Sequence, residues 1–268
     1  AGSRPDTGND AATEAGPLPS TMLCGREAGL PCPAPDAWGG NDGPGGPQRT
    51  FTEDELFVNC TFLSGHETDR QHHNLLTMYD GYLLMPWAPE EGRGGLTFWD
   101  ITDPCAPIER GVGLSEHMRE THSLGFSHLD GSYAVVNHIS GLFEDGGVEF
   151  WDVSDTSAPA VVGELDFPGF FYPDSYTRVG LSVFWQVPYV YVGGAQNGVW
   201  IGDATDPRAA RYVDTVSFEP TMQVGQVQAI GNLLVVTSAE GARVVLLDIS
   251  DPLAPMPIGG GDFLARDG

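Results

Sequence analysis

One short motif recurs four times along this chain, and its spacing constrains the fold more than any other feature. Each copy is an apolar run, an Asp, an apolar residue, Ser or Thr and a second Asp, and most copies continue with Pro. The first Asp of each copy is Asp100, Asp152, Asp203 and Asp248, so the copies lie 52, 51 and 45 residues apart. Propeller blades of four strands need about 40–50 residues each. The spacing therefore predicts an all-β chain, a β-propeller of four-stranded blades.

The residues between the motifs alternate short apolar runs with turn residues, as expected of strands and hairpins. No stretch carries a helical apolar period. We expect the propeller repeats within residues 51–268, with blades at about 66–115, 116–168, 169–218 and 219–264. Because propellers have about 4–8 blades, four repeats predict either a small ring or part of a larger or shared one. A strand at 56–63 could complete a blade formed by both ends of the chain.

The motif itself is expected to be structural rather than catalytic. Asp, Ser and Thr side chains form hydrogen bonds to nearby backbone in turns, and Pro presets the backbone of such a turn. Repetition in every blade favours this role over a catalytic carboxylate pair at Asp100 and Asp103. In the third copy Gly202 and Ala204 replace larger residues, and Ala209-Ala210 stand where Pro is expected, which predicts a blade that bends differently or has an altered edge.

Residues 1–50 differ from the rest, since they are rich in Gly, Pro, Asp and Ala without a hydrophobic period. This composition predicts an extended N-terminal arm. The four cysteines of the chain favour disulfides, and therefore an oxidising compartment, over zinc ligation, because no Cys-x-x-Cys pair is present. The expected pairs, of which the first would order part of the arm, are Cys24 with Cys32 and Cys60 with Cys105.

The charge balance excludes one class of partner. The chain has 37 acidic and 12 basic residues, a net charge of −25, and all its basic residues are Arg. Nucleic acids bind through cations that neutralise phosphates, so no nucleic-acid partner is expected. No apolar run approaches the ~18 residues of a membrane span. Together with the cysteines, these features predict an exported protein that is extracellular or on the cell surface. One form of surface attachment would be a lipid anchor at an N-terminus that is removed or absent from this sequence.

Three copies of the motif carry a resemblance to a known family. The stretches Phe98-Trp-Asp-Ile-Thr-Asp-Pro104, Phe150-Trp-Asp-Val-Ser-Asp155 and Leu246-Leu-Asp-Ile-Ser-Asp-Pro252 resemble the LVIVD repeat. The resemblance covers about residues 70–262. It implies an exported or surface β-propeller of bacteria or archaea, and it implies no particular chemistry.

Histidines are confined to one part of the chain, since all seven lie between positions 66 and 138. His73 and His122 occupy matching places before the first strands of the first two blades, and His72 and Glu120 accompany them. Such segments meet at one face of a propeller, and His with carboxylate binds divalent metals. These four residues are therefore the expected ligands of a divalent metal (Zn, Cu or Ca). The alternative is a polar channel in which they bond to backbone and water.

The later repeats bring other polar residues to the same region, and we expect them to contribute to binding: Asp174, Tyr176, Arg178 and Glu219. Three functions stay open on this basis. The first is an interaction module that binds a protein or glycan at the propeller face. The second is an exported metal-dependent enzyme with a His and carboxylate site. The third is a structural subunit whose ring closes with another chain.

Overall fold

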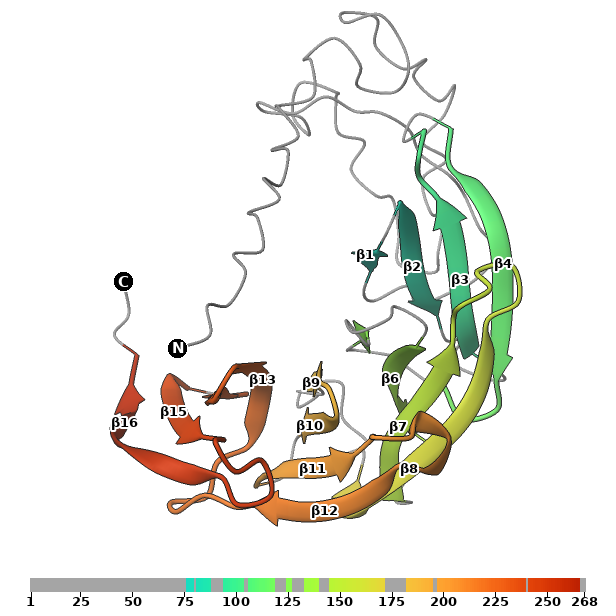
Figure 1. Cartoon of the computed structure of the whole chain (residues 1–268). Helices are drawn as coiled ribbons and strands as arrows, with labels where there is room; N and C mark the ends of the chain where they lie inside the picture. Colours follow the sequence, from blue (N-terminus) through green and yellow to red (C-terminus); the bar gives the residue numbers. More distant parts are fainter. Residues whose placement is uncertain are drawn as a thin grey trace, which may run out of the picture. The chain divides into compact units, whose positions relative to one another are not determined.

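The computed structural model of the chain describes residues 76–79, 81–87, 94–103, 106–118, 124–126, 133–139, 145–171, 182–194, 197–239 and 241–265. Their sixteen strands form four antiparallel sheets of four strands each (Figure 1). All of these strands belong to one compact unit, residues 67–101 and 108–268. The described residues contain one turn of 3-10 helix, Pro207–Ala209, and no helix that is long and apolar enough to cross a membrane.

Each sheet is built from four consecutive strands. The first contains β1 (Thr77–Tyr79), β2 (Tyr82–Trp87), β3 (Gly94–Asp100) and β4 (Ile108–Ser115). The second contains β5 (Leu124–Phe126), β6 (Tyr133–Ile139), β7 (Asp145–Asp152) and β8 (Ala160–Phe171). The third contains β9 (Ser182–Gln186), β10 (Tyr189–Gly193), β11 (Val199–Asp203) and β12 (Arg211–Val216). The fourth contains β13 (Val224–Ile230), β14 (Leu233–Ser238), β15 (Arg243–Asp248) and β16 (Met256–Leu264).

This architecture confirms the expected fold class, a β-propeller of four-stranded blades. β8 continues three residues past position 168, where the second blade was expected to end. Because the fourth sheet already has four strands of its own, its completion requires no strand from residues 56–63. That segment, the N-terminal arm and all four cysteines lie outside the described residues, so the disulfide pairs stay predictions.

The recurring motif closes the second, third and fourth sheets in the same way. The carboxylate of Asp203 accepts hydrogen bonds from the backbone and the hydroxyl of Thr205, at 3.0 and 2.7 Å. Asp152 and Asp248 bind the second residue after them, a Ser in each case, in the same manner. These local bonds hold the chain in the turn that leaves the third strand of the sheet. The structural interpretation of the motif is therefore confirmed for these three copies.

Neighbouring sheets pack face to face through their central strands. Phe98 and Leu96 of the first sheet form a buried cluster with Trp151 of the second. The second and third sheets are joined by an aromatic cluster that includes Phe150, Trp185 and Trp200. A third cluster, mostly aliphatic, joins the third and fourth sheets. Because each sheet alternates its side chains between two faces, the two middle sheets bury apolar residues on both sides.

Gly202, one of the departures of the third copy from the motif, has a packing role. A Cβ atom at this position would lie 2.6 Å from the Leu165 side chain of the second sheet. The glycine therefore lets the third sheet approach its neighbour closely. The third sheet still has four strands, with a register irregularity at 201–202 comparable to those in the other three sheets. The structure thus explains the small residue by close approach between sheets rather than by an unusual bend.

Candidate functional site

A group of polar side chains lies at the interface between the first and second sheets. His117 follows the end of β4, whereas Glu149 lies in β7 and Glu164 in β8. One potential ligand atom from each of these three residues lies within 4.8 Å of the other two. His117 Nδ1 is 3.3 Å from Glu164 Oε1. We call His117, Glu149 and Glu164 the acidic cluster.

Ser115, the last residue of β4, positions this cluster from the side of the first sheet. Its hydroxyl donates to Glu149 Oε1 at 2.5 Å and so connects the two sheets directly. The same oxygen accepts from the backbone N–H groups of His117 and Met118, at 3.0 and 2.9 Å. The chain after β4 therefore turns at the point where Ser115 binds the glutamate. As a result, the His117 side chain lies beside the second sheet.

The two carboxylates of the cluster differ strongly in exposure. Glu149 is 1% exposed, whereas 43% of the Glu164 side chain and 38% of the His117 side chain are accessible. Glu149 and Glu164 are also directly opposite each other in the pairing of β7 with β8. Like charges in directly opposed positions of a sheet destabilise it. The arrangement therefore places a buried and an exposed carboxylate side by side, with an imidazole next to them.

Among the residues that the structure describes, the cluster occurs in only one of the four repeats. By strand register, the pair that corresponds to Glu149 and Glu164 is Thr97 with Val112 in the first sheet, Trp200 with Thr215 in the third, and Val245 with Asp262 in the fourth. Ser115 lies 15 residues after its motif Asp, and the same position holds Phe167 in the second repeat and Phe218 in the third. Polar residues thus replace apolar ones on both sides of the first interface.

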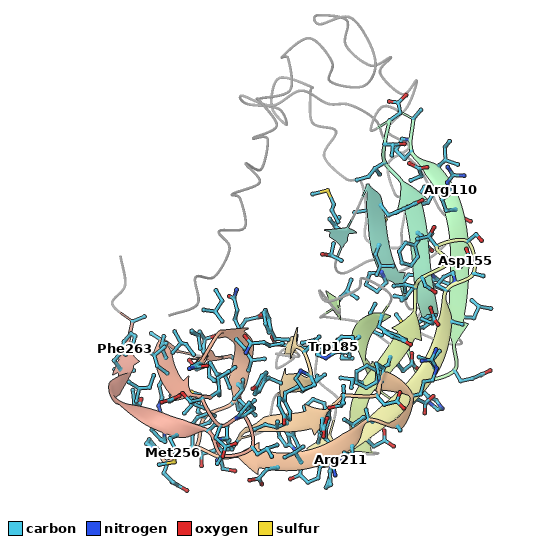
Figure 2. All side chains as sticks on the ribbon, in the orientation of Figure 1. Arg110, Asp155, Trp185, Arg211, Met256 and Phe263 are labelled. Carbon is cyan, nitrogen blue, oxygen red and sulfur yellow. The ribbon has the colours of Figure 1, made fainter. Side chains whose placement is uncertain are left out.

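A second feature is the face of the fourth sheet that points away from the third sheet. Along β13, β14 and β15, the residues on one face pack in the cluster with the third sheet, and the alternate residues, with those paired to them on β16, form the other face. We call the latter the outward face, and its apolar members are Ile230, Leu233, Val235, Val244, Leu246, Met256 and Phe263. Figure 2 labels Met256 and Phe263 on β16.

Val244, Leu246 and Phe263 of the outward face are more accessible than the corresponding residues of the second sheet. Val244 pairs with Phe263 as Val148 of the second sheet pairs with Leu165. Val148 is fully buried and Leu165 is 6% exposed, whereas Phe263 is 45% exposed. Val235 and Leu246 are likewise only partly buried. This face therefore has the side chains of a blade interface, but they are not enclosed as they are between the other sheets.

Negative charge lies at the edge of the outward face. Asp248 is exposed on this face, opposite Met256 in the sheet. The hydroxyl and the backbone N–H of Ser250 bind its carboxylate and lower its pKa. Arg243, the only basic residue in the described part of the fourth sheet, is bound to Asp262 at 2.7 Å. Asp248 is therefore ionised at neutral pH, and the arginine in the described part of the fourth sheet is already engaged.

Of the residues that the sequence predicted as a site, the structure describes one. Glu219 is exposed in the segment between β12 and β13, and its backbone carbonyl accepts a hydrogen bond from Arg243 at 3.2 Å. The others lie outside the described residues, so their ligand and binding roles stay predictions: His72, His73, Glu120, His122, Asp174, Tyr176 and Arg178.

The acidic cluster was not among the predicted sites, although one sequence signal points to it. Glu149 interrupts the apolar run Val148-Glu-Phe-Trp151 at a position where the other repeats have Thr97, Trp200 and Val245. Charged residues are rarely buried unless they are paired. An acid in the buried strand of one repeat therefore identifies that blade as the one with a different role.

No protein-family model matches this chain, and no curated protein matches it. Solved structures do match. A putative 6-phosphogluconolactonase from Bacteroides fragilis matches with a TM-score of 0.51 at 11% identity, over 70% of this chain and 56% of that one. The computationally designed Ika4 protein matches with a TM-score of 0.49 at 15% identity, over 71% of this chain and 99% of that one.

BamB from Moraxella catarrhalis matches with a TM-score of 0.43 at 18% identity, over 66% of this chain and 44% of that one. The chain thus spans nearly all of the designed protein and about half of the two natural ones. At these identities the likeness concerns the fold alone, and it is consistent with the β-propeller described above.

Proposed function

We propose that this chain is an exported β-propeller of the LVIVD-repeat kind that acts as an interaction module and binds a partner protein through the outward face of its fourth sheet. The observation that carries the proposal is the exposure of Phe263 beside the half-buried Val244 and Leu246. Contiguous apolar surface of this kind is typical of protein-binding sites. Phe263 lies on β16, an edge strand of the sheet, and an exposed aromatic side chain is a typical anchor of binding energy.

The charge of the chain supports one kind of partner. A net charge of −25 repels a second copy of the same chain and attracts a basic protein. Asp248 adds an ionised group at the edge of the apolar residues, and the described part of the fourth sheet has no uncommitted cation. The partner we propose is therefore a protein with an apolar centre surrounded by Arg or Lys. An extracellular or surface location agrees with the cysteines and the charge.

Site-specific photocrosslinking in cells of the source organism tests this proposal. A benzophenone amino acid replaces Met256, which is exposed on the outward face, and a matched probe replaces Ile108, which is exposed on the outer strand of the first sheet. We expect the probe at 256 to form an adduct with one other protein, identified by mass spectrometry, through a basic surface. Phe263→Glu and high salt should both suppress this adduct.

Three results would overturn the proposal. Crosslinks from position 256 only to the same chain would show that the outward face is covered internally. Crosslinks to a second copy would show self-association instead. Equal adducts from positions 256 and 108 would show that the capture is not specific to this face.

A further inference from the structure

We propose that the acidic cluster is a binding site for one divalent transition-metal ion of the Zn²⁺ or Mn²⁺ type, which connects the first and second sheets. Glu149 and Glu164 supply oxygen ligands from the second sheet, and His117 supplies a nitrogen ligand from the end of β4. The site is separate from the outward face of the fourth sheet, and the proposal does not depend on the function proposed for that face.

The first argument is electrostatic. Glu149 is almost completely buried and is directly opposite a second glutamate in the sheet. Burial of a carboxylate and repulsion between opposed carboxylates both destabilise a sheet, unless a positive charge compensates for them. A cation bound between the two glutamates would offset both costs.

The second argument is the comparison of repeats. At the corresponding positions, the second interface has Phe167 and Trp200 in one apolar cluster, and the third has Phe218 and Val245 in another. A blade interface therefore packs well with apolar residues at these two places. The first interface has Ser115 and Glu149 instead, joined by a hydrogen bond. Packing alone does not explain that exchange, whereas a ligand that needs oxygen donors does.

The third argument concerns the type of ligand. One imidazole with two carboxylates suits Zn²⁺, Mn²⁺ or Fe²⁺ better than Ca²⁺ or Mg²⁺, which prefer all-oxygen sites. Three protein ligands also leave a coordination position for water. The partial exposure of His117 and Glu164 allows an ion to enter from solvent. Ser115 is a positioning residue here, because it orients Glu149 and the turn that contains His117.

Calorimetric titration of the full chain with ZnCl₂, after removal of metals with a chelator, tests the proposal. We expect one ion per chain in the wild type. Groups that only orient a ligand contribute about 10–100-fold to metal affinity, so Ser115→Ala should weaken binding by roughly that factor. Glu149→Gln, Glu164→Gln and His117→Ala should each weaken binding more than Ser115→Ala does, because each of them removes a ligand. Zinc K-edge absorption should show one imidazole nitrogen among oxygen ligands.

The matched control removes the histidines that the sequence predicted as ligands, in the variant His73→Ala/His122→Ala. Full binding by this variant, together with loss in the cluster variants, supports the assignment. Wild-type protein that binds no Zn²⁺ or Mn²⁺ would overturn it, as would cluster variants that bind like the wild type. Loss of binding in the control variant alone would assign the metal to the other histidines. Glu164→Gln changes an exposed side chain, so this variant keeps the test valid if Glu149→Gln fails to fold.

Discussion

The interface between the first and second sheets and the interface between the second and third sheets are equivalent in the repeat, yet they are built from different chemistry. The first interface contains the Ser115–Glu149 hydrogen bond. The second contains an aromatic cluster in which Trp200 lies 4.9 Å from Phe170, ring centre to ring centre, in an edge-to-face arrangement. The comparison indicates that a blade interface requires side chains of complementary shape rather than apolar side chains in particular. One interface can therefore have polar groups that bind a ligand where the other has apolar contacts.

We expect the largest loss of unfolding free energy from Trp200→Ala. Trp200 is almost completely buried, and its indole N–H donates to the carbonyl of Pro168 at 3.2 Å. Truncation of such a side chain leaves a cavity and costs about 3–5 kcal/mol of unfolding free energy. Urea unfolding measures this loss, with Ile108→Ala, at an exposed position, as the control that should change by less than about 0.5 kcal/mol. A loss below about 1 kcal/mol would show that the aromatic interface is not what stabilises the middle sheets.

Gly113→Ala should cause the next largest loss of unfolding free energy, at the interface between the first and second sheets. A Cβ atom at Gly113 would lie 2.4 Å from both the Pro159 carbonyl oxygen and the ring of Trp151. Overpacking of this kind costs about 1–3 kcal/mol, which thermal unfolding would detect. Gly259→Ala is the matched control, because a Cβ atom there would meet no atom within 4 Å. Equal stability of the two variants would mean that the first two sheets can separate without cost, contrary to the close packing described here.

The turns that close the sheets should be independent of which interface a sheet forms. Asp203→Ala removes the acceptor for Thr205 and the ion pair with Arg211, and we expect a loss of about 1–2 kcal/mol at pH 7. Asp100→Ala in the first sheet removes the ion pair with Arg110 and should cost a similar amount. A much larger loss in one of the two variants would show that the turns and the interfaces are coupled.

The pH dependence of the Asp203 effect follows from its pKa. The Thr205 hydroxyl, and then Arg211, lower the pKa of Asp203 below its ordinary value. A carboxyl with a lowered pKa stabilises the folded state above the pKa of the unfolded chain, about 3.9, and this contribution is lost as the pH falls through the folded value. The difference between wild type and Asp203→Ala should therefore be constant from pH 5 to 7 and shrink below about pH 4. A difference that grows on acidification would contradict the assignment.

The four sheets and three of their turns could be predicted from the sequence, because the motif that specifies them is repeated. The motif predicted four sheets and the turns at Asp152, Asp203 and Asp248, because both depend on local bonds and on spacing along the chain. The acidic cluster could not be predicted in the same way. Its residues come from two sheets, and their proximity depends on register and on the β-bulge at 150–151.

The outward face shows a second limit of sequence reasoning. Val244 and Leu246 continue the apolar alternation of the other blades, so nothing in the pattern shows that they are less buried than Val148 or Phe150. Exposure depends on what each sheet packs against, which is a property of the whole arrangement. The acid at position 149 is different, since it breaks the pattern in one repeat and could be recognised by comparison of the four copies.

The smallest expected change in stability is that of Glu149→Gln without metal. It is the most informative about the first interface, because this variant should be more stable than the wild type, whereas the other variants should be less stable. Without metal, Glu149→Gln removes one of two opposed charges, and its amide oxygen can still accept from Ser115. We therefore expect a gain of about 0.2–1 kcal/mol in unfolding free energy in the presence of EDTA. Glu164→Gln should give the same gain, and the double variant should add little, because the repulsion is already absent.

Zinc should reverse this order of stability. At a free concentration 100-fold above its dissociation constant, a bound ion stabilises the folded state by about 2.7 kcal/mol. Only the wild type should gain this amount, so it should become more stable than Glu149→Gln. Thermal unfolding of both proteins with EDTA and with Zn²⁺ measures the crossing. If Glu149→Gln is the less stable protein under both conditions by the same margin, the glutamate is a packing residue of the interface, and the difference between the two interfaces is one of composition alone.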